Sequence, residues 1–80
     1  MDTTKYLTKE KFSELEKELQ DLKTVKRKEV ATNLEYARSL GDLSENAEYQ
    51  EARELQAGIE DRIATIENTL KTAEIVRESH

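Results

Sequence analysis

The chain has 80 residues and a formal net charge of −5, with 39% charged residues, 35% hydrophobic residues and no cysteine, proline or tryptophan. This composition excludes a disulfide framework, a thiol nucleophile and a thiolate metal site, and it argues against a compact globule with a thick core. High charge with regular apolar spacing is typical of a long helix or coiled coil, and the negative balance argues against general nucleic-acid binding.

The sequence also lacks the features of exported and membrane proteins. It contains no apolar run long enough to span a bilayer, and the polar segment 1–8 has no signal-peptide core. We therefore expect a cytoplasmic protein that does not contact a membrane.

The first predicted element is a helix over about 8–40. Thr8 is placed to act as its N-cap, and Gly41 is a natural stop because glycine readily adopts the left-handed conformation. The first part of its apolar stripe follows the 3-4-3 spacing of a coiled coil, and Lys26 then creates a four-plus-four stutter. The stripe consists of Phe12, Leu15, Leu19, Leu22, Val30, Leu34 and Ala37.

The second predicted element is a helix over about 44–75, after a short tip at 41–45. A stutter of the same kind is expected from Leu55 through Ile59 to Ile63. The tail that follows begins as a strand at Ile75. The apolar stripe of this helix consists of Ala52, Leu55, Ile59, Ile63, Ile66, Leu70 and Ala73.

The two stripes match as the facing surfaces of an antiparallel hairpin, because facing positions then have residue numbers with a constant sum. That sum is 85 for Phe12–Ala73, Leu15–Leu70, Leu19–Ile66, Leu22–Ile63, Lys26–Ile59, Val30–Leu55 and Asn33–Ala52. We predict one all-α domain over 1–80, with two long antiparallel helices that form a coiled-coil hairpin with an acidic tip. It would be ~50 Å long at ~1.5 Å per residue. Polar seam positions at Lys26 and Asn33 predict a looser half near the tip.

The candidate site is the pair Asp42 and Glu45 at the tip, supported by Glu48. Two hard carboxylate ligands suit Mg²⁺, although such a pair would need further ligands from a partner to hold the ion. A structural interpretation competes, because Asp42 and Glu45 match a capping box for the second helix. Ser44 is an alternative N-cap. A free carboxylate oxygen would remain in either case.

Cations form a second feature of the sequence. Lys23, Lys26, Arg27 and Lys28 lie within six residues of the first helix. They would suit a nucleic-acid backbone, but the pattern alone favours the structural interpretation, a solvated helix face. Arg38 and Arg53 flank the tip, where pairing with Glu35, Glu48 or Glu54 is the structural alternative. The sequence has no nucleophile–base pair, phosphate loop or zinc motif, so a self-sufficient enzyme is not expected.

At this point the residues resemble the N-terminal coiled-coil domain of the bacterial Gre-type transcript cleavage factors. The similarity covers nearly the whole chain, and its most specific part is the string G-D-x-x-E-N-A-E-Y. The matching segments are Leu7–Thr8, Leu19–Lys28, Glu35–Arg38, Gly41–Tyr49, Glu51–Glu54 and Ala73–Val76.

The resemblance implies a function in transcription elongation. Hairpins of that family enter the secondary channel of bacterial RNA polymerase and stimulate cleavage of backtracked RNA by the polymerase active site. By resemblance, Asp42 and Glu45 are the tip carboxylates that help to hold a second Mg²⁺ shared with the polymerase, and the chain needs no cofactor by itself. Arg38 and Arg53 match positions of a basic patch that faces the RNA 3′ end. Charge alone extends this patch to Lys23, Lys26 and Arg27.

Two other functions stay open at this stage. Some related proteins use the hairpin to inhibit the polymerase, and the presence of both Asp42 and Glu45 favours cleavage over inhibition. A purely structural coiled-coil module is the other alternative. The family's C-terminal FKBP-like domain, which docks at the channel rim, is expected to be absent from this chain.

Overall fold

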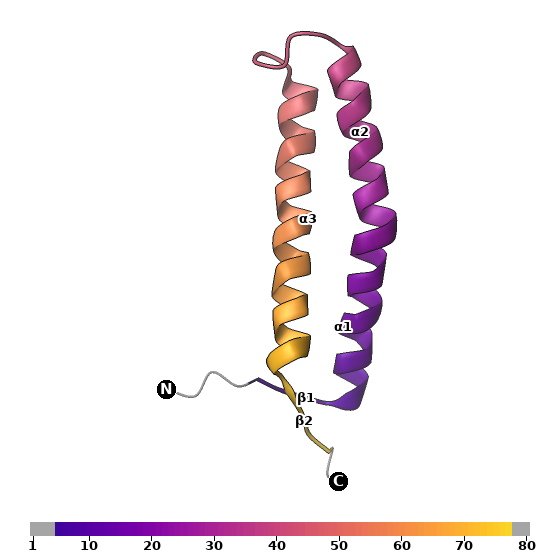
Figure 1. Ribbon diagram of the computed structural model, residues 1–80, viewed down its shortest axis with the longest axis vertical. Coiled ribbons are helices and arrows are strands. Elements are labelled where there is room, and N and C mark those ends of the chain that lie inside the picture. Colours follow the sequence, from indigo (N-terminus) through magenta and orange to yellow (C-terminus); the bar gives the residue numbers. More distant parts are fainter. Residues whose placement is uncertain (1–4, 78–80) are drawn as a thin grey trace.

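The computed structural model describes residues 5–77 and shows a long helical hairpin with a small strand pair at its base (Figure 1). The chain runs up one arm, turns at residues 40–46, here called the tip, and returns down the other arm (Figure 1). Its longest dimension is 58 Å. In chain order the elements are β1 (Tyr6–Leu7), α1 (Lys9–Asp21), η1 (Leu22–Lys26), α2 (Arg27–Ser39), α3 (Ala47–Thr72) and β2 (Glu74–Ile75).

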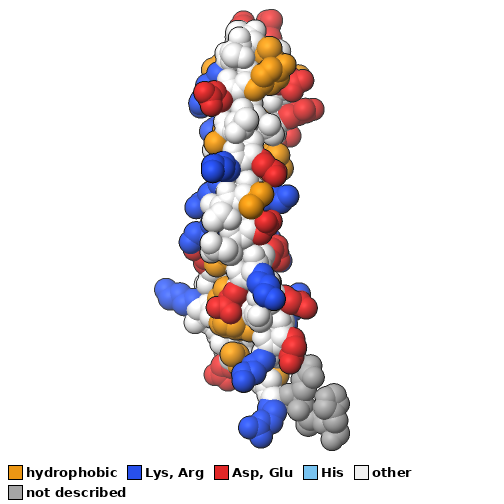
Figure 2. All heavy atoms as spheres, turned by 90° about the vertical axis from the view of Figure 1, so that its right-hand side faces the viewer, with side chains coloured by type: hydrophobic (Ala, Val, Ile, Leu, Met, Phe, Trp, Pro, Cys, Tyr) orange, Lys and Arg blue, Asp and Glu red, His pale blue; other side chains and the backbone are white. Residues whose placement is uncertain are grey.

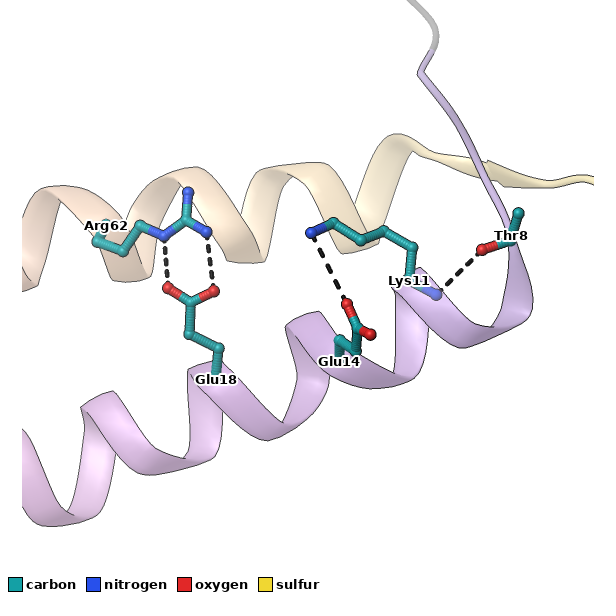
Figure 3. Close-up of polar contacts among 5 residues, drawn as sticks. All are labelled: Thr8, Lys11, Glu14, Glu18 and Arg62. Carbon is teal, nitrogen blue, oxygen red and sulfur yellow. Dashed lines mark hydrogen bonds and ion pairs between the residues drawn. The ribbon is translucent and has the colours of Figure 1, made fainter.

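The first arm, made of α1, η1 and α2, begins and ends where its flanking residues dictate. The Thr8 hydroxyl accepts a hydrogen bond from the amide of Lys11 at 3.1 Å and so caps α1, as the sequence indicates (Figure 3). At the far end, Gly41 has a φ of 109°, a left-handed value that disfavours other residues. Both ends therefore follow from local residues, a capping hydroxyl at one end and a glycine at the other.

The two strands at the base add to the expected all-α fold. They pair in parallel, with Tyr6 opposite Glu74 and Leu7 opposite Ile75. The amide of Val76 donates to the carbonyl of Leu7 at 2.8 Å. The predicted second helix therefore ends at Thr72 and not near Ile75. Strands of two residues show no alternating pattern, so the sequence does not reveal their pairing.

The second arm, α3, carries a continuous heptad seam. Leu55, expected in the seam, is 50% exposed, and the neighbouring Gln56 is half-buried in its place. The predicted stutter in this helix is therefore wrong, because a seam through Gln56 keeps alternating steps of three and four. The buried and half-buried seam positions are Tyr49, Ala52, Gln56, Ile59, Ile63, Ile66, Leu70 and Ala73.

The stutter in the first arm is real, and a π-helical turn absorbs it. The amide of Arg27 donates to the carbonyl of Leu22, five residues back, and the Thr24 hydroxyl donates to the carbonyl of Gln20 at 2.7 Å. Every residue from 23 to 29 is exposed. The seam thus passes directly from Leu22 to Val30, and Lys26 is not a seam residue, contrary to the expectation.

The half of the hairpin near the tip is well packed and not loose. Val30, Leu34 and Ala37 of α2 are each at most 5% exposed, and Ala52 of α3 is buried at 5%. Val30, Leu34 and Ala52 belong to one apolar cluster with Ile59 and Ile63. Asn33 is exposed beside this seam and does not interrupt it, so neither predicted polar seam position weakens the core.

Ion pairs fasten the two arms along their middle section. Arg62 of α3 makes two hydrogen bonds to the Glu18 carboxylate, at 2.7 and 2.8 Å (Figure 3). Arg27 makes a bidentate contact of the same kind with the Glu60 carboxylate, also at 2.7 and 2.8 Å. Bidentate contacts fix the relative orientation of the two side chains as well as their separation, so they help to hold the register of the arms. None of the helices in residues 5–77 is long and apolar enough to cross a membrane.

Candidate functional site

Asn46 joins the two arms at the tip. Asn46 is the N-cap of α3, because its side-chain oxygen accepts a hydrogen bond from the amide of Tyr49 at 3.1 Å. Its side-chain nitrogen donates to the carbonyl of Ala37 at 2.7 Å, across the tip at the end of α2. One amide side chain therefore starts the second arm and holds it to the first.

The capping interpretation of Asp42 and Glu45 is consequently wrong, and so is the alternative with Ser44 as N-cap. The second helix begins at Ala47, later than the expected start near residue 44. Asn46 suits this position because its amide oxygen accepts from the helix and its amide nitrogen donates to the opposite arm, whereas an ionised carboxylate has no donor. The two carboxylates therefore do not serve as helix caps.

Asp42 instead stabilises the turn itself. Its Oδ1 atom accepts hydrogen bonds from the Ser44 hydroxyl at 2.8 Å and from the Ser44 amide at 3.1 Å. These two donors lower the pKa of Asp42, which is exposed, so the side chain stays a carboxylate well into the acid range. The carbonyl of Ser44 accepts from the Gln50 side chain at 3.3 Å, which ties the turn to α3.

Glu45 is exposed beside this turn and makes no side-chain hydrogen bond or ion pair within residues 5–77. Across the same residues no group of three His, Cys, Asp or Glu side chains is placed to hold a metal ion. The oxygens of Asp42 and Glu45 have the right chemistry for Mg²⁺. They fit the role of additional ligands to an ion that other groups already hold.

The predicted RNA-binding cations divide into two groups. Within residues 5–77, Arg38 makes no side-chain hydrogen bond or ion pair, and Arg53 donates only to Gln56 at 2.9 Å. The alternative in which they pair with Glu35, Glu48 or Glu54 is therefore not what the structure contains. The cations farther from the tip are paired: Lys23 with Glu67 at 3.3 Å, Lys26 with Glu29 at 3.9 Å, and Arg27 with Glu60 at 2.7 Å.

This division favours the structural interpretation for Lys23 and Arg27, because both join the arms. Arg38 and Arg53, in contrast, have no carboxylate partner within residues 5–77. All five side chains are exposed, and their assignment to RNA remains a prediction.

The sequence interpretation did not assign a role to Ser44 in orienting Asp42, or to Asn46 in closing the tip. A local signal existed for Asn46, since asparagine directly before an amphipathic helix is a preferred N-cap. No local signal revealed its second bond, because the Ala37 carbonyl comes from the other arm.

Residues 5–75 match the family model described as the N-terminal part of transcription elongation factors, GreA and GreB. The chain belongs to the Gre family of transcription elongation factors. The matched range includes both arms, the tip and the strand pair.

Individual family members are similar over most of this chain. It is 55% identical over 73 residues to the transcription elongation factor GreA of Clostridioides difficile, which is 91% of this chain and 46% of that protein. It is 56% identical over 70 residues to GreA of Listeria welshimeri, covering 88% of this chain and 44% of the relative. For GreA of Thermoanaerobacter pseudethanolicus the identity is 57% over 72 residues, covering 90% and 46%. The chain thus spans about half the length of the curated relatives it matches.

Proposed function

We propose that the chain acts as an antiparallel coiled-coil hairpin whose acidic tip stimulates cleavage of backtracked RNA by bacterial RNA polymerase. Its site of action would be the secondary channel of the polymerase, in the cytoplasm. The observation that carries the proposal is the pair of exposed carboxylates, Asp42 and Glu45, at the end of a rod 58 Å long in a member of the Gre family.

The hydrogen bonds at the tip support this role. Asn46 performs the capping that the carboxylates would otherwise perform, and Ser44 orients the Asp42 carboxylate. Asp42 is exposed and its pKa is lowered by the Ser44 donors, so it is ionised at neutral pH and can offer carboxylate oxygen to a cation. When a divalent ion is present in the polymerase, it would supply charge stabilisation at the scissile phosphate. The hairpin contributes oxygens at that place and no nucleophile, so it stimulates the polymerase and is not an enzyme by itself.

The basic residues nearest the tip suit the second part of the task. Arg38 and Arg53 have no carboxylate partner within residues 5–77 and would meet the phosphates of the displaced RNA 3′ segment. Lys23, Lys26 and Arg27 would extend this contact only if RNA competed with Glu67, Glu29 and Glu60.

The decisive experiment is a transcript-cleavage assay on a backtracked elongation complex with the double variant Asp42→Asn and Glu45→Gln. The amide introduced by Asp42→Asn still offers an oxygen to Ser44, so the turn should persist and helicity should be unchanged. We expect stimulation of cleavage to fall by about 10–100-fold or more, the scale seen when supporting groups of metal sites are lost.

The matched control replaces two carboxylates away from the tip, Glu35→Gln with Glu54→Gln, and should cleave like wild type. Normal cleavage by the tip variant would refute the assignment. Slower RNA synthesis without short fragments would identify a channel inhibitor. No effect and no binding by the wild type would leave a purely structural module.

A further inference from the structure

The half of the hairpin near the tip carries a groove that the proposed cleavage chemistry does not use. It lies between the arms on one flank and has a volume of about 340 Å³. Space-filling representation shows an apolar patch toward this end of the rod, with acidic side chains along one side of it (Figure 2). The residues that line the groove are Asn33, Tyr36, Glu48, Glu51, Ala52 and Leu55.

Large apolar side chains of this groove remain in solvent. Tyr36 is 60% exposed and Leu55 is 50% exposed, on opposite arms, and both line the same depression. Leu40, one turn beyond Tyr36, is 53% exposed. Leu55 directly precedes the seam residue Gln56, so it points about 100° away from the seam. These side chains do not stabilise the hairpin core, and clustered apolar exposure of this kind marks interaction surfaces.

The carboxylates of the groove decide which kind of partner fits. Glu48 and Glu51 lie one turn apart on α3 and make no ion pair within residues 5–77. Arg53, two positions after Glu51, projects about 200° around the helix to the other flank and contacts the seam residue Gln56. Arg38, two positions after the groove residue Tyr36, lies about 200° from it in the same way. Near the tip, the hairpin therefore has an acidic, apolar flank and a basic flank. The acidic flank repels phosphates and suits a cationic protein segment with apolar side chains.

We propose that this groove docks a basic, apolar segment of polypeptide from the wall of the polymerase channel. This inference rests on the proposed function, since the groove adjoins the tip that enters the channel. The RNA then faces the opposite flank, with Arg38 and Arg53. The hairpin is thereby oriented about its long axis, and the tip carboxylates arrive on the correct side.

The test measures affinity of the chain for stalled elongation complexes together with transcript cleavage over a range of concentrations. The groove variant is Glu51→Gln with Leu55→Gln, two exposed helical positions whose replacement keeps good helix formers. We expect its apparent Kd to rise about tenfold or more, as for loss of an interface anchor with its charge partner. Because the tip is intact, cleavage should return at saturating concentration.

The matched control is Glu54→Gln with Val25→Gln, which also removes one exposed carboxylate and one exposed apolar side chain but lies outside the groove. It should bind like wild type. Cleavage and affinity of the groove variant equal to wild type would overturn the docking surface alone and leave the proposed function standing. Absence of polymerase binding by the wild-type chain would overturn both.

Two other occupants would also contradict the proposal. If sedimentation showed that wild type is a dimer and the groove variant a monomer, the groove would be an interface between two copies. If the groove variant changed crosslinking to the RNA 3′ segment without changing affinity for the polymerase, the occupant would be RNA.

Discussion

The first arm of the hairpin interrupts its heptads with the π-helical turn at Leu22–Lys26, whereas the second arm keeps its heptads from Tyr49 to Ala73. Between facing seam positions the first arm uses eight residues, from Leu22 to Val30, and the second uses seven, from Gln56 to Ile63. The extra residue is taken up within residues 23–29, all of which are exposed. An insertion in a coiled coil is therefore tolerated when one turn absorbs it away from the seam.

Deletion of one exposed residue from each arm tests this difference between the arms most directly. Deletion of Ala57 from α3 should turn the seam on one side by about 100°. That change removes several buried side chains from the core, so we expect a loss of about 3 kcal/mol or more in the free energy of unfolding. Deletion of Val25 should convert the π turn to regular α-helix and change stability by about 0.5 kcal/mol or less. Urea unfolding followed by circular dichroism measures both.

Equal destabilisation by the two deletions would contradict the idea that the first arm holds a removable residue. A Val25 deletion that retains the fold but loses binding to the polymerase would assign the π turn to function instead.

Gln56 marks the seam of the second arm, and its replacement tests that position. Replacement of this half-buried amide by leucine should raise the free energy of unfolding by about 1 kcal/mol, because apolar surface then fills the seam beside Val30. Leu55→Gln, the neighbouring change at an exposed site, should alter stability by less than about 0.5 kcal/mol. Thermal and urea unfolding of both variants distinguish the positions. The reverse ranking would place the seam at Leu55.

The ion pairs that link the arms make the stability of the hairpin depend weakly on pH. Hydrogen bonds from Arg62 and Arg27 lower the pKa values of Glu18 and Glu60. In the unfolded chain both carboxyls return to their ordinary pKa of about 4.3, so that state binds protons first as the pH falls. The stabilisation is thus complete above this pH and is lost as the pH falls through the lower pKa values of the folded protein.

We expect Glu18→Gln with Glu60→Gln to flatten the dependence of the urea midpoint on pH between about 5 and 3. The control Glu16→Gln with Glu54→Gln removes two exposed carboxylates that join no partner on the other arm within residues 5–77. It should leave the slope unchanged. The side chains of the Arg62–Glu18 and Arg27–Glu60 pairs are largely exposed. The difference in slope between the two variants should therefore be modest, and it should shrink further in high salt. An unaltered slope in the first variant would show that these pairs do not stabilise the hairpin.

Sequence patterns were sufficient for the two long helices, because apolar periodicity, the Thr8 cap and the Gly41 stop are local signals. They also identified the stutter in the first arm. They misplaced the seam of the second arm. Leu55 is more hydrophobic than Gln56, so periodicity alone does not show that Gln56 is the half-buried residue. The carboxylates of the tip were found from charge and resemblance, whereas their release from capping depends on Asn46 and on a carbonyl of the opposite arm.

The double attachment of Asn46 has a consequence for chain entropy. A loop such as residues 40–46, at the end of a rod, would normally sample many conformations. Here the amide ties the start of α3 to the carbonyl of Ala37, and the Ser44–Asp42 hydrogen bonds fix the curve between them. The tip is thus preorganised before it meets any partner, and little ordering remains to oppose association.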